Sequence, residues 1–522
     1  MVDLPPVSRH EYKPDASFDG GNLDCGNGLL LLIRKHIDPL EPGELLEFRS
    51  TEPSVEVDLP SWCRLTKNEL VSWCKNNNER SYLICKGPFD ASSSSPTVSS
   101  SNVAKTTVTK TDRPRRLPPD STSSSAAQTV HPLSVMGIGS WPRPQWLIRS
   151  LHDWLRGKVG DEEFQATADD AVRLAIDAQL RAGVDVITDG EQRRDNYSSF
   201  VGRLLDNCEL IPLSDLVSLV DEPDKFQKLL ETAAIPADKV RHPVVTGKLS
   251  CSNGLAIHEL KFAQTITDKP IKVSLPGPYL LTRTMWLECI TDRAYSSREE
   301  LSVDIMRILR AEIDSLLSQG ASIIQLDEPV LTEILFSAPN ATRTFMCGAL
   351  SERGDASAEL EFATHLINSV TEGFPIDRLG LHICRGNWSP DESVALTGSY
   401  DALLPLLEKV RVGILFLEFC TSRAGEMDVL AHLPAATRVG VGLVNQKNST
   451  VETVDEIVAR ANEAIAIIGK ERLLITPDCG FATFADSPVS TVETAVAKLT
   501  ALAKASAILK QNGSTSTTPS GH

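Results

Sequence analysis

The sequence contains no long hydrophobic run near its start and no excess of basic residues. Residues 29–33, the longest aliphatic run there, are far too short to cross a bilayer, and residues 1–15 lack the apolar core of a signal peptide. The formal net charge is −17, whereas binding to nucleic-acid phosphates needs a basic surface. We therefore expect neither a membrane nor a nucleic acid as partner, and we expect a cytoplasmic protein.

The chain also lacks the cysteine density of a small secreted domain. Its 11 cysteines are spread over 522 residues, which is not the pattern of a disulfide framework. In a reducing compartment, such cysteines are core residues, metal ligands or reactive thiols. Because 41% of the residues are hydrophobic, the chain can bury a sizeable core, and its length allows more than one domain.

A change in composition divides the chain into two folded units. Between residues 91 and 130, serine runs with scattered proline and basic residues cannot bury enough surface to offset the entropy of ordering. The sequence therefore predicts a small N-terminal domain, a flexible linker, a large catalytic domain and a disordered tail. Their predicted boundaries are 15–88, 89–131, 132–511 and 512–522.

The N-terminal domain is predicted to be a compact two-layer α/β module. The expected strands are residues 22–25, 44–49, 69–74 and 81–86, and the expected helices are 29–36 and 55–64. Cys25 lies where the first strand meets a glycine-containing helix start, and the positive end of a helix dipole lowers the pKa of a thiol there. The alternative is that Cys25 is a small buried hydrophobic residue.

The large domain contains eight short apolar runs, each followed by a helical stretch. Residues 169–181, for example, carry small apolar residues on one face and stop at Gly183. This repeat predicts a (β/α)8 barrel with its largest insertion at 195–268, and a doubly wound open sheet is the competing fold. The runs are 134–138, 184–188, 271–275, 322–326, 379–383, 413–417, 438–443 and 473–476.

Three of these runs end in residues that bind metals. His382 and Cys384 are two residues apart, so they point to the same face of a strand. Cys479 follows the eighth run, and Glu418 follows the sixth. One histidine, two cysteines and one carboxylate suit zinc. Cys420, which shares a face with Glu418, is the alternative fourth ligand.

This ligand set predicts the class of substrate. Two thiolates and a carboxylate place three negative charges around zinc, which weakens it as a Lewis acid toward water. It can still deprotonate an incoming thiol and leave the sulfur electron-rich enough to attack carbon. A hydrolytic zinc site more often uses several neutral histidines. We therefore expect a substrate that carries a thiol.

Other strand ends supply groups for an amino acid. Glu191, Asp327 and Glu328 offer carboxylates for an ammonium group, and Ser140 with the amides around Gly139 can hold a carboxylate. The alternative for the two adjacent acidic residues is that they cap a helix. An amino acid with a thiol side chain would satisfy all these groups.

The large domain resembles the C-terminal catalytic barrel of cobalamin-independent methionine synthase and its shorter core homologues. The resemblance extends from residue 133 to about residue 510. It rests on the segments Ile138-Gly-Ser140-Trp-Pro142, residues 183–191, Gly277-Pro278, residues 324–329, His382-Ile-Cys384, Glu418 with residues 421–423, and residues 477–480.

The resemblance implies a zinc-dependent methyl transfer to the thiol of homocysteine, giving methionine. It implies zinc bound by His382, Cys384, Glu418 and Cys479. It places Ile138, Ser140, Glu191 and Asp327 around homocysteine, with Asp327 and Glu191 as the catalytic residues. The donor would be 5-methyltetrahydrofolate, as a polyglutamate, or a methyl-corrinoid protein. A decarboxylase of the related uroporphyrinogen type shares the barrel but needs no metal.

The N-terminal domain resembles the TusA-like sulfur carriers. The resemblance covers residues 15–87 and includes Cys25, the segment Pro42-Gly43-Glu44 and residues 58–63 and 82–87. Such carriers hold a persulfide on the cysteine that corresponds to Cys25. The family has Cys-Pro-x-Pro where this chain has Cys-Gly-Asn-Gly. The alternative function is a sulfur-relay protein, in which Cys25 carries sulfur to a substrate in the barrel.

Overall fold

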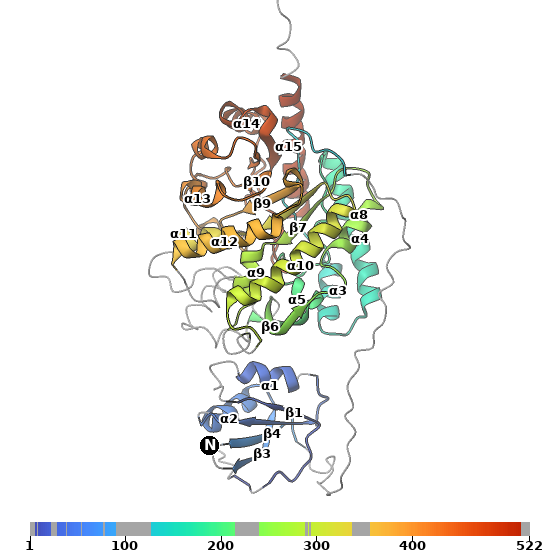
Figure 1. The fold of residues 1–522 in the computed structure, drawn as a ribbon. Helices are drawn as coiled ribbons and strands as arrows, with labels where there is room; N and C mark the ends of the chain where they lie inside the picture. The colour runs from blue at the N-terminus through green and yellow to red at the C-terminus, as the bar shows by residue number, and fades with distance from the viewer. Residues whose placement is uncertain are drawn as a thin grey trace, which may run out of the picture. The chain divides into compact units, whose positions relative to one another are not determined.

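The structure is a computed structural model, and its described residues form two compact units (Figure 1). They are residues 6–7, 9–21, 29–37, 39–53, 55–76, 79–89, 127–213, 240–287, 291, 294–336 and 355–512. Cys25, most of the predicted linker and the predicted tail beyond residue 512 lie outside them. Within the described residues, no helix is both long enough and apolar enough to span a membrane.

The N-terminal unit is a four-stranded sheet with two helices. Its strands have the order β1-β2-β4-β3, with β1 parallel to β2 and the other two pairings antiparallel. The strands are β1 (Ala16–Asp19), β2 (Leu45–Ser50), β3 (Glu69–Asn76) and β4 (Glu79–Cys85), and the helices are α1 (Leu30–Ile37) and α2 (Val55–Leu65). The first strand precedes the predicted residues 22–25, which lie outside the described chain.

Both helices of this unit bury their apolar residues against β2 and β4. Ile33 of α1, Leu59 of α2, and Phe48 and Tyr82 of the sheet belong to one buried cluster. Phe48 and Tyr82 stack with their ring centroids 5.0 Å apart. A helix layer on one sheet face is the arrangement that the period of apolar residues predicted.

Residues ahead of the predicted domain start at residue 15 also contact this sheet. Val7 forms a parallel bridge with Cys74 of β3. His10 lies within hydrogen-bond distance of two serine hydroxyls, Ser72 at 2.7 Å and Ser81 at 3.0 Å.

The large unit is built on a parallel sheet of six strands. They are β7 (Lys272–Pro276), β8 (Ile323–Asp327), β9 (Leu379–Ile383), β10 (Ile414–Leu417), β11 (Arg438–Gly442) and β12 (Leu473–Thr476). The spatial order β12-β11-β10-β9-β8-β7 follows the order in the sequence without reversal. The sheet therefore has no switch point of the kind that defines a doubly wound fold.

The first two predicted strands of the large unit form single bridges instead of ladders. Val135 bridges to Ile475 of β12, and Met136, next to it, bridges to Val186. Ile187 in turn bridges to Ile271, the residue before β7. All three bridges are parallel, so the two short segments connect one end of the six-stranded sheet to the other.

Helices flank the strands, as Figure 1 shows. The α-helices are α3 (Gln145–Leu155), α4 (Asp161–Ala182), α5 (Val201–Leu204), α8 (Ile257–Gln264), α9 (Pro278–Thr284), α10 (Arg298–Ser318), α11 (Val330–Phe336), α12 (Ala356–Thr371), α13 (Leu404–Leu407), α14 (Val454–Ile468) and α15 (Val492–Asn512). Short 3₁₀ turns are η4 (Ile376–Arg378), η5 (Glu392–Val394), η6 (Tyr400–Leu403), η7 (Ser422–Ala424), η8 (Met427–His432) and η9 (Lys470–Arg472). In the insertion, β5 (Asp206–Pro212) pairs antiparallel with β6 (Arg241–Ser250).

Local signals in the sequence set the ends of the long helices. α4 ends at Gly183, whose φ of 83° is a left-handed conformation that costs glycine little. α14 begins with a capping box, in which the Thr453 hydroxyl accepts from the Glu456 amide and the Glu456 carboxylate accepts from the Thr453 amide.

Two glycines make room for a large ring inside the sheet. Phe416 of β10 is fully buried in a cluster with residues from β8, β12 and the two bridging segments. A Cβ on Gly380 of β9 would lie 2.6 Å from the Phe416 ring, and one on Gly440 of β11 would lie 2.4 Å from it. The ring therefore fills space that both neighbouring strands leave open.

Replacing Gly440 by Ala should lower the free energy of unfolding by about 1–3 kcal/mol, the usual cost of overpacking a core. The added methyl group would meet Thr476 at 3.2 Å as well as the Phe416 ring, so it finds no free space on either side. Denaturant unfolding measures the change. Gly137→Ala is the matched control, since its Cβ would meet no atom within 4 Å beyond its chain neighbours. Equal stability of the two variants would contradict this account of the core.

Candidate functional site

Three of the four predicted metal ligands meet at the carboxyl end of the sheet. His382 lies in β9, Cys384 follows this strand by one residue, and Cys479 follows β12. The ligand atoms of these three residues all lie within 4.8 Å of one another. Each side chain is at least 95% buried. The distances allow all three donors to bind one ion.

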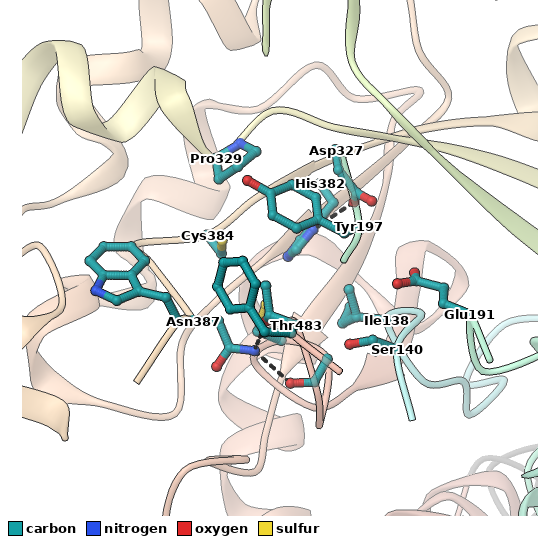
Figure 2. A pocket seen from close by; sticks show the side chains of 14 residues that line it. Ile138, Ser140, Glu191, Tyr197, Asp327, Pro329, His382, Cys384, Asn387 and Thr483 are labelled. Carbon is teal, nitrogen blue, oxygen red and sulfur yellow. Dashed lines mark hydrogen bonds and ion pairs between the residues drawn. The ribbon is translucent and has the colours of Figure 1, made fainter. Parts of the chain in front are cut away.

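Asp327 orients the imidazole of His382. His382 Nδ1 lies 2.8 Å from Asp327 Oδ1 (Figure 2), whereas the buried Nε2 has no hydrogen-bond partner among the described residues. Burial lowers the pKa of His382, but the contacts with Asp327 and Cys384 outweigh it and raise the pKa above its ordinary value. With Nδ1 protonated toward the carboxylate, Nε2 offers its lone pair, as in metal sites where a carboxylate holds the ligating histidine.

A hydrogen-bonding proton between Cys384 and Cys479 shifts the pKa values of the two thiols in opposite directions. A hydrogen bond from Cys479, with the nearby His382, lowers the pKa of Cys384 to about 6. The same hydrogen bond and burial raise the pKa of Cys479 well above its ordinary value. A cation that binds both sulfurs would replace this proton, because a metal-coordinated thiol is deprotonated. The orphaned Nε2 and the thiol pair thus fit a thiophilic metal ion.

Glu418 follows β10 and lies close to the three ligands without belonging to their group. Its side chain is fully buried, and neither carboxylate oxygen has a hydrogen-bond partner among the described residues. The nearest cation is Arg385, whose Nη1 lies 3.7 Å from Glu418 Oε2. Burial, with Cys384 and Asp478 nearby, raises the pKa of Glu418.

The alternative fourth ligand, Cys420, contacts other groups. Arg460 Nη1 lies 2.7 Å from its sulfur, and the carboxylate of Glu452 lies 3.8 Å away. Burial raises the pKa of Cys420 to about 12. It is not one of the three residues whose ligand atoms are grouped together.

A pocket opens above the three ligands (Figure 2). All four residues that the sequence placed around the substrate line it, and so do the three grouped ligands. Sequence reasoning missed the remaining residues, although most of them follow a ligand by only a few positions. The lining residues are Ile138, Ser140, Glu191, Tyr197, Asp327, Pro329, His382, Cys384, Asn387, Trp388, Cys479, Gly480, Thr483 and Phe484.

Two buried carboxylates face this pocket. Asp327 belongs to β8, and Glu191 follows the second bridging segment with a left-handed φ of 55°. Burial raises the pKa of Glu191 to about 7, Arg194 opposes this shift, and Asp327 adds to it. Arg194 is bound mainly to Glu259, at 2.6 Å, and lies 4.0 Å from Glu191. Oε2 of Glu191 is buried without a hydrogen-bond partner among the described residues.

Ser140 is fixed by the loop that follows β12. Its carbonyl accepts from the amide of Phe481 at 3.0 Å, and its hydroxyl accepts from the amide of Ala482 at 3.3 Å. A Cβ on Gly480 would lie 2.2 Å from this hydroxyl, so only glycine allows the approach. Asn387 holds the same loop, since its Nδ2 donates to the Gly480 carbonyl at 2.6 Å.

Glu328 stabilises a helix and does not line the pocket. Its carboxylate accepts from the amides of Tyr279 and Leu280, each at 2.8 Å, at the start of α9. Burial raises the pKa of Glu328 to about 8, and the two amides oppose this shift. The helix-capping alternative therefore applies to Glu328, and Asp327 is the residue of this acidic pair that faces the pocket.

A family model for the catalytic domain of cobalamin-independent synthases matches residues 133–505. The chain belongs to this family. Curated members similar to it are the methionine synthases of Sulfolobus acidocaldarius, at 26% identity over 67% of this chain and 86% of the relative, and of Pyrococcus abyssi, at 27% identity over the same shares. The family match does not include the N-terminal unit.

Solved structures of the family share the fold. A B12-independent methionine synthase from Shewanella sp. W3-18-1, in complex with selenomethionine, superposes with a TM-score of 0.56 at 22% identity. A putative vitamin-B12-independent methionine synthase from Listeria monocytogenes superposes with a TM-score of 0.53 at 20% identity. Each covers 73% of this chain and 99% of its own.

Replacing Glu328 by Gln should lower the stability of the protein without changing how much metal the purified protein retains. A glutamine side chain accepts with one oxygen only, so one of the two α9 amides faces an NH2 group and loses its acceptor. The expected loss is about 1–3 kcal/mol of unfolding free energy, measured in denaturant. A variant of unchanged stability that no longer retains metal would contradict the capping role.

Proposed function

We propose that the chain is a zinc-dependent methyltransferase that moves a methyl group from a methyl-folate to the thiol of homocysteine, giving methionine. One observation carries the proposal: His382, Cys384 and Cys479 gather beneath a pocket that two buried carboxylates also line. Membership of the cobalamin-independent synthase family supports the reaction. The methyl-corrinoid donor that the sequence left open finds no support in this family.

Zinc fits the donor set, with Glu418 as its fourth ligand. Two sulfurs and an imidazole nitrogen are ligands that zinc prefers, and beside them lies the buried carboxylate of Glu418, whose oxygens accept no hydrogen bond from the described residues. When bound, zinc would lower the pKa of the substrate thiol so that the thiolate can attack the methyl group. His382 is held ready by Asp327, so the ligand does not need to reorient.

The residues of the pocket orient the amino-acid part of homocysteine. Asp327 and Glu191 hold its ammonium group, because both carboxylates face the pocket and neither is neutralised by a full ion pair there. The fixed hydroxyl of Ser140 is placed for the carboxylate, and Ile138 packs against the aliphatic part. These contacts aim the sulfur toward the two cysteines and His382.

Aromatic residues of the pocket lining suit the methyl donor. Tyr197, Trp388 and Phe484 line the pocket together with the polar groups of Asn387 and Thr483. Flat heteroaromatic rings such as a pterin stack favourably on aromatic side chains. We assign these aromatic residues to the methyl-folate. Its methyl group would then meet the homocysteine sulfur inside the pocket.

We further propose that the large unit is a closed (β/α)8 barrel. The bridges of Val135, Met136 and Ile187 support closure, since they connect β12 to β7. The metal ligands support it as well. In a flat sheet, the ends of β9 and β12 would be about 14 Å apart, because they are three strand spacings from each other. Their ligand atoms lie within 4.8 Å, which requires strong curvature.

The order of elements in the N-terminal unit supports a TusA-like module. Its β1-α1-β2-α2-β3-β4 order and its mixed sheet agree with a small two-layer sulfur-carrier fold. Cys25, the residue that would carry sulfur, lies outside the described residues. We place the catalytic activity in the large unit, because the three grouped ligands and all the residues that line the pocket belong to it.

The purified protein should contain one zinc ion per chain, and Cys479→Ser should lose both the metal and the methyl transfer. Removing one thiolate takes away one of the three charged ligands that would hold the ion. Metal analysis and labelled methyl transfer from methyl-folate to homocysteine measure the two effects. Cys420→Ser is the matched control and should keep both. Cys25→Ala should also remain active, and loss of methyl transfer with an intact fold would show that the two units are coupled.

Methionine should bind more tightly as the pH rises from about 6 to 8, and Glu191→Gln should remove most of this dependence. The pKa of Glu191 is raised to about 7, so its carboxylate becomes charged in this range, while the ammonium of methionine stays protonated. Methionine has no thiol, so its own titration does not interfere. Calorimetry at several pH values measures the affinity. An equally steep dependence in the variant would contradict the assignment of Glu191.

A further inference from the structure

Two buried polar side chains beneath the pocket are connected to Asp327 but do not line the pocket. Lys272 begins β7, and Gln325 lies in the middle of β8. Lys272 Nζ donates to Gln325 Oε1 at 2.6 Å, and Gln325 Nε2 donates to Asp327 Oδ1 at 2.7 Å. Since Asp327 also contacts His382, a continuous chain of hydrogen bonds runs from a buried lysine to a proposed zinc ligand.

The lysine determines which way the glutamine amide points. An ammonium group can only donate, so the oxygen of the amide must face Lys272 and its NH2 group must face the other way. The two hydrogens of this NH2 group then have two acceptors, Asp327 Oδ1 and the hydroxyl of Ser274, which lies 3.4 Å away. Every polar atom of the Gln325 side chain is thus used.

This arrangement makes the two oxygens of Asp327 different. Oδ1 accepts from Gln325 at 2.7 Å and contacts His382 Nδ1 at 2.8 Å. Among the described residues, no hydrogen bond reaches Oδ2, and the side chain lines the pocket. A carboxylate free to rotate could exchange its two oxygens, whereas two donors on one oxygen hold the group in one orientation.

Lys272 is held in place by the interior of the sheet. Its side chain is 1% exposed, and its ammonium group lies 4.3 Å from the centre of the Phe416 ring. Burying a cation so deeply costs free energy unless nearby groups compensate it. Burial lowers the pKa of Lys272 to about 7, and the nearby carboxylates of Asp327 and Glu191 oppose this shift.

We propose that Lys272 and Gln325 are positioning residues that assign the two oxygens of Asp327 to separate tasks: Oδ1 fixes the imidazole of His382, and Oδ2 binds the ammonium group of the substrate. The inference rests on the proposed function, because it names how this one carboxylate serves both the metal and the amino acid. Through this chain of hydrogen bonds, the buried amide of Gln325 fixes the orientation of the Asp327 carboxylate. That carboxylate in turn holds the His382 imidazole and binds the substrate ammonium.

Gln325→Glu tests the chain with almost no change in shape. The new carboxylate can still accept from Lys272, but it has no hydrogen to donate to Asp327 Oδ1 and repels it. We expect zinc affinity, measured by competition with a chelator, to fall about 10–100-fold, as when the partner of a ligating histidine is lost. We expect KM for homocysteine to rise more than kcat falls, since the ammonium contact is present in both the ground state and the transition state.

Lys272→Met and Lys272→Arg form the second test. Methionine fills the space but leaves the amide free to flip, so zinc and methionine should both bind more weakly. Arginine keeps a donor for Gln325 Oε1 and should restore part of both affinities relative to methionine. Lys498→Met is the matched control, because Lys498 is equally buried but donates to the Thr450 carbonyl and to Glu452 outside the pocket. It should bind zinc and methionine as the parent does.

Thermal unfolding of each variant separates positioning from folding. The proposal is overturned if Gln325→Glu and Lys272→Met bind zinc and methionine as tightly as the parent does. It is also overturned if Lys498→Met weakens binding as much as Lys272→Met, because the effect would then follow from lost stability. A parent protein that binds zinc and methionine but transfers no methyl group would instead refute the proposed function and leave the positioning role standing.

Discussion

Curvature of the parallel sheet is the constraint on which the site depends. His382 and Cys384 come from β9, Cys479 comes from β12, and two strands lie between them. Their ligand atoms can meet within 4.8 Å only if the sheet bends far enough for the two strand ends to face each other. Phe416, accommodated by the glycines of its neighbours, fills the inside of this bend. The packing of the core and the geometry of the predicted metal ligands therefore depend on the same curvature of the sheet.

Buried charge is the second theme of the site. Several carboxylates lie in the same low-dielectric interior, where an uncompensated charge is costly. Glu328 is satisfied by the amides of α9, and Oδ1 of Asp327 by Gln325 and His382. Glu191 and Glu418 keep oxygens without partners among the described residues. A substrate ammonium and a metal ion would supply partners for these oxygens. The carboxylates that lack partners are therefore the ones proposed to bind ligands.

The two units of the chain have separate sheets and separate hydrophobic cores. The N-terminal unit has its own sheet, its own helix layer and its own core, so it does not need the large unit to bury its apolar residues. The residues of the family match and all the grouped ligands belong to the large unit. The family assignment and the candidate metal site therefore concern the large unit and do not depend on the N-terminal unit.

The sequence alone determined which residues end the strands and which chemistry they favour. Apolar runs of the right length and spacing identified all six strands of the large sheet, and His382, Cys384 and Cys479 stand out because thiols and imidazoles rarely end such runs together. Only the tertiary structure decided how these groups are used. It turned Glu328 toward the amides of α9, turned Cys420 toward Arg460, and joined Lys272 to Asp327 through Gln325. The reason is that a strand pattern specifies the face to which a side chain points, whereas its partners come from strands and helices distant in the sequence.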